Sequence, residues 1–221
     1  MGARLSQDQA SEPVNEQSNH DTSQISHTNT KAHQSIKEVP FPHNCEEILR
    51  HADVPVDRSS RKKLLEQLHE GVFLNQKRKK YYVEKETNHN CFILFARDLA
   101  ITWSEDIRFW HWPILEESSN DERLAVAELL NVAWLEVHGR FDIANLSPGT
   151  TYEIVFIVKL TETAYGWRVP VNLRLTLPDG SRQEHKENLL EKPRERWIEI
   201  PAGEFKTSAD NIGEMEFSLY E

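Results

Sequence analysis

The sequence of 221 residues predicts a mainly β protein with antiparallel strands, arranged as a β-sandwich or jelly roll. Short apolar runs of strand length recur from Tyr81 to the end of the sequence. Turn signals such as Pro178-Asp179-Gly180 separate these runs, which is typical of antiparallel connections. Helical periodicity is clearest in a short preface before residue 72, and residues 115–130 form a helical or loop-like interruption among the strands.

Residues 1–40 are expected to form a disordered arm. They contain no Phe, Trp, Tyr or Cys, so all the aromatic residues of the chain come later. Such a segment cannot bury enough apolar surface to offset the entropy that is lost on ordering. A plain solvated tail is the favoured interpretation, and a docking or modification segment that carries Ser and Thr is the alternative.

Two short helices are expected in the preface. Asn44 would cap the first, over residues 45–50, because its side chain can accept hydrogen bonds from free backbone N–H groups. The second would begin at Asp57 or Ser59 and end at Gly71. Its apolar face is a packing stripe formed by Leu64, Leu65 and Leu68. Docking of a partner on this stripe is the minority interpretation.

A basic cluster, Lys77-Arg78-Lys79-Lys80, ends the preface and linker of residues 41–80. It could be a localisation signal or an anion-binding patch. A solvated connector between the second helix and the first strand is slightly favoured, because four charges in an acidic protein are weak support for a dedicated site.

The strand region follows as residues 81–221. The run over residues 152–160 is apolar on both faces, which suits a strand at the centre of two packed layers. The segment from Asn145 to Tyr152 predicts a tyrosine corner, in which the Tyr152 hydroxyl bonds to backbone a few residues upstream. The expected strands cover residues 91–96, 99–103, 132–137, 152–160, 171–177, 197–200 and 214–219.

Composition excludes several classes of function. The net charge of −10 disfavours broad binding to a phosphate backbone, which needs a positive stripe. No apolar run approaches the length of a membrane span, and the N-terminus lacks the hydrophobic block of a secretory signal. The two cysteines, Cys45 and Cys91, are expected to be reduced thiols of a cytoplasmic protein that could also be nuclear.

Motifs for catalysis are missing from the sequence. There is no Gly-rich phosphate loop, no paired-cysteine motif, no His-Glu-x-x-His and no Gly-x-Ser-x-Gly. The ten histidines are dispersed, so neither a metal nor another cofactor is expected. The protein is therefore not expected to be an enzyme. A glycoside hydrolase built on two of its many carboxylates ranks third among the possible functions.

Tryptophans gather in the most informative stretch, residues 101–112. Three of the six tryptophans, Trp103, Trp110 and Trp112, fall among charged side chains there. Exposed indole rings would offer flat apolar faces that suit the C–H faces of pyranose sugars. Inward packing is equally open for Trp103 and Trp110, and it is favoured for Trp112, which precedes Pro113.

A set of motifs, in order along residues 41–221, carries a family resemblance. They are the runs Asn90–Trp103, Phe109–Trp112, Val132–Val137, Leu146–Thr150, Ala164–Trp167, Trp197–Ile200 and Gly203–Phe205. Together they resemble the phloem protein 2 family with its Nictaba-type lectin domain, and in particular the phloem protein 2-like A subgroup. The resemblance implies a jelly-roll β-sandwich that binds N-acetylglucosamine oligomers or the cores of N-glycans, is not an enzyme, and forms a homodimer.

The resemblance also implies which residues bind sugar: Trp103, Trp110, Glu214 and Glu221. Glu214 and Glu221 lie seven residues apart, so in one unbroken strand their side chains would point to opposite faces. Both reach one site only if the strand bends or ends between them. Family members continue beyond the position of Glu221, so residues 81–221 are expected to form a lectin domain without its final strand.

The expected function is therefore that of a carbohydrate-binding lectin. Its partners would be glycans or glycoproteins that carry N-acetylglucosamine, together with a second copy of the chain. The alternative is a protein- or RNA-interaction protein of the phloem whose lectin activity has lapsed, although the net charge does not favour RNA.

Overall fold

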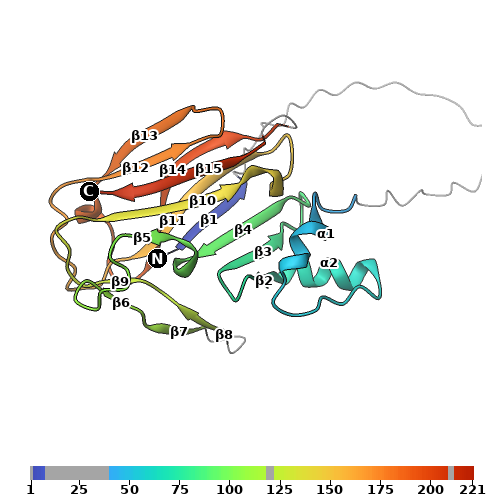
Figure 1. The fold of residues 1–221 in the computed structure, drawn as a ribbon, viewed down its shortest axis with the longest axis horizontal. Coiled ribbons are helices and arrows are strands. Elements are labelled where there is room, and N and C mark those ends of the chain that lie inside the picture. The colour runs from blue at the N-terminus through green and yellow to red at the C-terminus, as the bar shows by residue number, and fades with distance from the viewer. Residues whose placement is uncertain (1, 8–39, 118–121, 209–211) are drawn as a thin grey trace, which may run out of the picture.

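The computed structural model describes residues 2–7, 40–117, 122–208 and 212–221, and within them the fold is mainly β. One sheet has the strand order β14-β11-β1-β4-β3-β2 and the other the order β13-β12-β15-β10-β5 (Figure 1). Every strand pair is antiparallel, which confirms the predicted class; the jelly-roll connectivity stays a prediction.

The six-stranded sheet consists of β1 (Gly2–Gln7), β2 (Val72–Leu74), β3 (Lys79–Val83), β4 (Asn90–Phe95), β11 (Thr151–Lys159) and β14 (Trp197–Lys206). The five-stranded sheet consists of β5 (Ala100–Ile101), β10 (Glu136–Asp142), β12 (Val171–Thr176), β13 (Arg182–Glu187) and β15 (Glu214–Tyr220). Two short ribbons pair β6 (Trp110–His111) with β9 (Glu128–Leu129), and β7 (Ile114–Glu117) with β8 (Glu122–Ala125). The helices are α1 (Cys45–Ile48) and α2 (Arg61–Glu70), and the 3-10 turns are Leu49–His51, Ala96–Asp98, Ile143–Asn145 and Leu189–Glu191.

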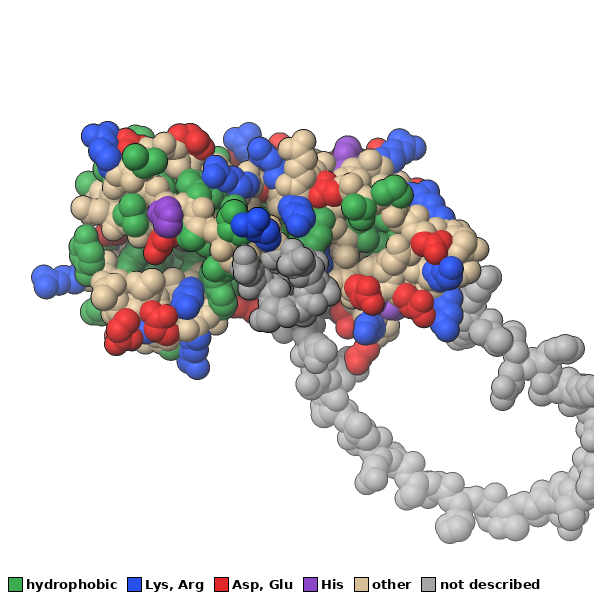
Figure 2. Space-filling model, turned by 90° about the horizontal axis from the view of Figure 1, so that it is seen from below, with side chains coloured by type: hydrophobic (Ala, Val, Ile, Leu, Met, Phe, Trp, Pro, Cys, Tyr) green, Lys and Arg blue, Asp and Glu red, His purple; other side chains and the backbone are tan. Residues whose placement is uncertain are grey.

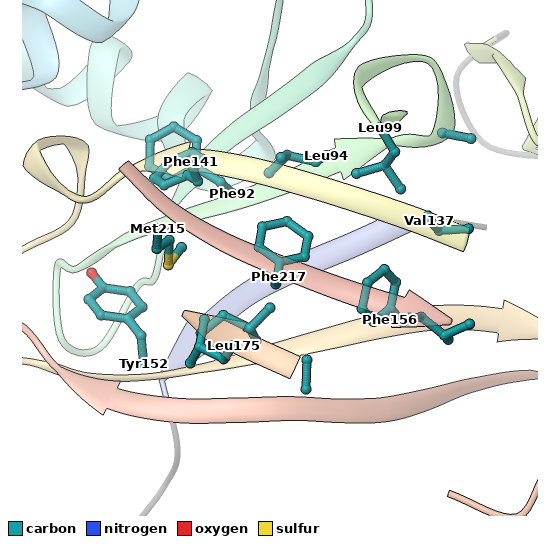
Figure 3. Close-up of a cluster of buried hydrophobic side chains, with 14 of the residues drawn as sticks. Phe92, Leu94, Leu99, Val137, Phe141, Tyr152, Phe156, Leu175, Met215 and Phe217 are labelled. Carbon is teal, nitrogen blue, oxygen red and sulfur yellow. The ribbon is translucent and has the colours of Figure 1, made fainter. Parts of the chain in front are cut away.

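The two large sheets pack face to face through aromatic side chains (Figure 3). The ring centroids of Phe156 in β11 and Phe217 in β15 lie 5.7 Å apart, and those of Phe92 and Phe141 lie 4.8 Å apart. Both pairs join one sheet to the other, so the alternating apolar residues of the strands meet in a single core. β11 is buried on both faces over its middle, as its sequence predicted.

Several expected strands have different lengths in the structure. The strand expected over residues 99–103 is only Ala100–Ile101, because Thr102 begins a turn. The strand expected over residues 132–137 begins at Glu136. β13 was missed altogether, because its six residues are polar and almost fully exposed at the sheet edge and show no apolar alternation.

The expectation of a disordered arm is wrong for residues 2–7. Gly2–Gln7 form β1, which lies between β4 and β11 and pairs with both (Figure 1). Backbone hydrogen bonds on two sides can hold a strand without aromatic side chains, so the composition of the segment did not reveal it. The rest of the expected arm, residues 8–39, lies outside the described residues.

The preface forms the two expected helices with different caps. Asn44 precedes α1 in a left-handed conformation without a side-chain cap; its amide instead donates to Asn145 Oδ1 at 3.3 Å. α2 begins after Ser60, whose hydroxyl accepts the Lys63 backbone N–H, rather than at Asp57 or Ser59. Gly71 ends α2 with a φ of 95°, as expected, and the buried face of the helix includes Leu64 and Leu68.

The basic cluster lies in the β2–β3 hairpin rather than in a free linker. The backbone N–H groups of Gln76 and Lys77 donate to the Asp53 carboxylate at 2.5 and 2.6 Å. The Lys79 ammonium forms an ion pair with Asp98 at 3.4 Å. The cluster is therefore tied into the hairpin, and a role in localisation or anion binding stays a prediction.

The predicted tyrosine corner is present. The Tyr152 hydroxyl accepts the Ser147 backbone N–H at 3.0 Å and donates to the Asn90 carbonyl at 2.9 Å. Burial raises the pKa of Tyr152 to about 12, so the hydroxyl keeps the proton that it donates. This residue therefore joins β11 to β4 and to the turn that precedes β11.

Asn90 extends the corner to the preface. Its side chain is fully buried, donates to the carbonyls of His43 at 2.6 Å and Asn145 at 2.8 Å, and accepts the Tyr81 hydroxyl at 2.9 Å. Its backbone N–H donates to Ser147 Oγ at 3.0 Å. The Asn90 side chain thus forms hydrogen bonds to three separate segments of the chain.

Both cysteines are free thiols in the interior. Burial raises the pKa of Cys45 to about 11. Among the residues that the structure describes, no helix combines the length and the apolar composition that a membrane crossing requires.

We expect Asn90→Leu to lower the free energy of unfolding by about 3–5 kcal/mol, because it removes the partner of the buried Tyr81 hydroxyl and of the partly buried carbonyls of His43 and Asn145. Asn131→Leu, at an exposed position, is the matched control and should change it by less than about 0.5 kcal/mol. Urea denaturation measures both values. Equal values for the two variants would contradict the role given to Asn90.

Candidate functional site

The candidate site is the loop of residues 102–109, between β5 and β6, which we call the Trp103 loop. Its backbone is held by successive turns, in which Asp106 N–H donates to the Trp103 carbonyl at 2.9 Å and Phe109 N–H to the Asp106 carbonyl at 2.9 Å. At its start, Thr102 N–H donates to the Glu136 carbonyl at 3.0 Å. The loop is therefore anchored to the first residue of β10.

The indole N–H groups of two tryptophans donate hydrogen bonds to the backbone of the Trp103 loop. Trp110 Nε1 donates to the Thr102 carbonyl at 3.1 Å, and Trp112 Nε1 donates to the Ser104 carbonyl at 2.9 Å. The guanidinium of Arg97 lies 3.5 Å from the centroid of the Trp112 ring. The carbonyls on either side of Trp103 are thus fixed by buried or half-buried rings.

Trp103 itself points outward. Its side chain is 49% exposed, and its ring centroid lies 5.4 Å from that of Phe109. Its φ of 59° is uncommon for a residue with a Cβ, so the turns around it hold a strained backbone conformation. Its ring borders a shallow, open hollow lined by Ile101, Ser104, Glu105, Asp106 and Ile107.

Asp106 and Arg108 form an ion pair at the tip of the Trp103 loop. The Asp106 carboxylate accepts the backbone N–H of Arg108 at 3.0 Å and its guanidinium at 2.6 Å. These hydrogen bonds lower the pKa of Asp106 to about 2, so the carboxylate is ionised at neutral pH. The hydrogen bonds hold the Asp106 and Arg108 side chains against each other.

Polar side chains on the outer face of β10 lie beside the loop. The Thr102 hydroxyl donates to Glu136 Oε2 at 3.1 Å, and His138 Nε2 lies 2.9 Å from Glu136 Oε1. These contacts, with His138 the larger contributor, lower the pKa of Glu136. The outward alternation of Glu136 and His138 was visible in the sequence, but only the pairing of β5 with β10 places them beside Trp103.

The structure corrects the expectation for Trp110. Its side chain is 2% exposed and packs in the core, so it offers no face to a ligand. Its N–H group is already used by the Thr102 carbonyl. Trp110 therefore acts as a support for the site rather than as a second stacking surface.

The two glutamates do not meet. β15 pairs without a break along β10, with Glu214 opposite Asp142 and Tyr220 opposite Glu136. Six residue steps place Glu214 about 20 Å from the Glu136 end, away from the Trp103 loop. Glu221 lies at the correct end, where its N–H donates to the Leu135 carbonyl at 3.0 Å, but on the opposite side of β10 from Thr102, about 10 Å away.

The candidate site combines an exposed aromatic face with polar side chains. Over the described part of the chain, no group of three or more His, Cys, Asp or Glu side chains could hold a metal ion. A half-exposed indole with an ionised carboxylate and a hydroxyl beside it suits a ligand with both apolar C–H faces and hydroxyl groups. These features define a mainly β domain with a half-exposed indole on a loop that backbone hydrogen bonds hold in place.

Comparison with known proteins identifies the family. The family model of phloem protein 2 matches residues 89–221, and the chain belongs to this family. It is 51% identical over 186 residues to Protein PHLOEM PROTEIN 2-LIKE A1 of Arabidopsis thaliana, covering 83% of this chain and 74% of that protein. It is 47% identical over 184 residues to a lectin of Luffa acutangula, covering 82% of this chain and 87% of the lectin.

A lectin of Coccinia grandis is 31% identical over 130 residues, which cover 58% of this chain and 82% of that lectin. These relatives support a lectin or phloem-protein role.

The two tryptophans should respond oppositely to truncation. We expect Trp110→Ala to lower the free energy of unfolding by about 3–5 kcal/mol, because it empties a core site and frees the Thr102 carbonyl. Trp103→Ala should cost less than about 1 kcal/mol. Trp103→Gly should be at least as stable as Trp103→Ala, because glycine adopts a φ of 59° without strain. Urea denaturation of the three variants tests this order, and a large loss in Trp103→Ala would show that this ring belongs to the core.

Proposed function

We propose that the protein is a lectin that binds N-acetylglucosamine oligomers or N-glycan cores at the Trp103 loop, without cleaving them. The observation that carries the proposal is the half-exposed Trp103, held outward by a braced loop beside the ionised Glu136. Membership of a family whose relatives include proteins named as lectins supports it.

Each part of the site has a separate task in this proposal. The face of Trp103 stacks on the C–H face of a pyranose ring or on the methyl group of an acetamido substituent. Glu136 accepts a hydroxyl of the sugar, and the Thr102 hydroxyl orients that carboxylate. Trp110 supports the loop, and Glu221 contacts only those ligands that extend across the start of β10. Glu214 takes no part.

The proposal includes a homodimer, because one shallow site encloses little of a glycan and binds it weakly. Two sites on one dimer make the second contact intramolecular and raise the avidity by about 10²-fold or more. It also places the protein in the cytoplasm or nucleus, where the free thiols of Cys45 and Cys91 would stay reduced.

Isothermal titration with chitotriose tests the site. We expect Trp103→Ala to weaken binding about fivefold, which corresponds to the roughly 1 kcal/mol of a ring contact. Trp197→Ala is the matched control, because that ring is 46% exposed but lies on β14 in the other sheet. Equal losses for both variants, or no binding by the unaltered chain, would overturn the proposal. Retention of partners from a phloem extract in excess free chitotriose would then favour a protein- or RNA-interaction role.

The pH dependence of chitotriose binding tests Glu136. Hydrogen bonds from His138 and Thr102 hold the pKa of Glu136 below its usual value, so the carboxylate stays an ionised acceptor to a lower pH than an ordinary Glu does. We expect the affinity to fall in acid only when the pH falls through this lowered pKa, below the pH at which an ordinary Glu is protonated. Glu136→Gln should bind more weakly at pH 7 and show no further loss in acid. If the affinity of Glu136→Gln for chitotriose still falls in acid, the loss comes from the titration of another group.

A further inference from the structure

The five-stranded sheet carries a row of residues that begins at the Trp103 loop and crosses three strands. Figure 1 shows β5, β10, β15 and β12 side by side, in the order that their pairing gives. The backbone N–H of Thr102, just after β5, donates to the Glu136 carbonyl in β10. Glu136 lies opposite Tyr220 in β15, and Tyr220 lies opposite Asn172 in β12. We call these four residues the Tyr220 row.

The alternation of the strands places the Tyr220 row on the outer face of the sheet. Val137 and Leu219 are buried between the two sheets, so the adjacent side chains of Glu136 and Tyr220 point to the opposite face. Both of these side chains are partly exposed. Residues that lie directly opposite on one face of an antiparallel pair have Cβ atoms about 5 Å apart. Tyr220 therefore begins beside the carboxylate that the proposed sugar site uses.

The Tyr220 side chain is held in place at its hydroxyl end. The hydroxyl donates to Glu184 Oε1 at 2.5 Å and accepts a hydrogen bond from the Arg174 guanidinium. The same guanidinium donates to Glu184 at 3.2 Å, and its Cζ lies 4.8 Å from the centroid of the Tyr220 ring. Arg174 belongs to β12 and Glu184 to β13, so these contacts direct the ring from β15 across β12.

The Tyr220 row matches the length of a short sugar oligomer. Neighbouring strands lie about 4.8 Å apart, which is close to the length that one β1,4-linked pyranose adds to a chain. Two strand separations lead from Thr102, the neighbour of Trp103, to Tyr220, and the tyrosine side chain continues over β12. An oligomer of about four or five sugars that stacks on Trp103 can therefore reach the Tyr220 ring, whereas a disaccharide is too short.

Polar groups lie along the Tyr220 row between the two aromatic rings. His138 Nε2 lies 2.9 Å from Glu136 Oε1, and its Nδ1 lies 3.5 Å from Glu216 Oε1. These carboxylates can accept sugar hydroxyl groups, and ionised acceptors form the stronger hydrogen bonds. The outer face thus combines aromatic rings with hydroxyl partners, which is the combination that a sugar chain requires.

The apolar groove at the end of the sandwich is a separate surface. Figure 2 shows hydrophobic side chains gathered around a hollow at the end of the molecule where β6 and β9 lie. Buried apolar side chains such as Val158 and Leu160 line this groove, and its lining includes neither Thr102 nor Tyr220. Apolar walls offer few partners to sugar hydroxyls, so the Tyr220 row continues the sugar site better than the groove does.

We propose that Tyr220 is a second aromatic contact for sugar, which stacks on the far end of N-acetylglucosamine oligomers bound at the Trp103 loop. The inference rests on the proposed lectin function and adds to it a preference for longer oligomers. Tyr220 takes the place that the buried Trp110 leaves open as a second stacking ring. Arg174 and Glu184 are positioning residues, because they act on the ligand through the ring that they hold.

Isothermal titration of the full chain with chitobiose and chitopentaose tests the second contact. We expect Tyr220→Ala to bind chitopentaose about fivefold more weakly than the unaltered chain does, because it loses one ring contact. The same variant should lose no affinity for chitobiose, which also shows that it is folded. Tyr82→Ala is the matched control, because Tyr82 is a partly exposed tyrosine on β3 in the other sheet. It should keep both affinities.

Tyr220→Phe separates the ring from its hydroxyl. We expect it to keep most of the affinity for chitopentaose, because a phenyl ring can stack in the same way. A loss as large as that of Tyr220→Ala would overturn the stacking role.

Other outcomes separate this inference from the proposed function. Equal affinity of the unaltered chain for the two sugars, or equal losses for both in Tyr220→Ala, would overturn the second contact. The Trp103 site would still stand if Trp103→Ala weakened the binding of chitobiose. Failure of the unaltered chain to bind either sugar would overturn both proposals.

Discussion

The structure depends above all on the buried hydrogen bonds of Asn90 and Tyr152. Asn90 is the first residue of β4, and its amide reaches backbone carbonyls of the helical preface and of the turn before β11. The Tyr152 hydroxyl closes the same turn onto β4. Because an unpaired polar group in the core costs free energy, these bonds exclude other placements of the preface and the crossover. They hold the end of the sandwich opposite to the Trp103 loop.

The sequence predicted most of this scaffold, because its strands alternate. The corner at Tyr152 and the doubly buried β11 followed from residue types and spacing alone. β13 did not, because an exposed edge strand has no apolar face to leave a pattern. β1 did not either, because its placement depends on backbone pairing with two strands that are distant in sequence. Local composition carries no information on such pairings.

The candidate site was predicted only in part, for a related reason. Trp103 and Trp110 stand in similar polar surroundings in the sequence, yet one is half exposed and the other is buried. The positive φ at Trp103 turns that side chain outward, and a single sequence shows this poorly, because glycine rather than tryptophan usually marks such a conformation. The unbroken β15 then separates the two glutamates, since Glu214 begins the strand and Glu221 follows its other end. Tertiary pairing, not spacing, selects the residues that meet.

The start of β10 joins the core of the sandwich to the candidate site. Leu135 is buried, while the next residue, Glu136, faces outward beside Trp103. The carbonyl of Leu135 accepts the Glu221 N–H and that of Glu136 accepts the Thr102 N–H, so this short segment is held from both sides. Burial of Leu135 fixes the backbone at the neighbouring Glu136. The core packing of one residue therefore sets the position from which the next residue presents its carboxylate beside Trp103.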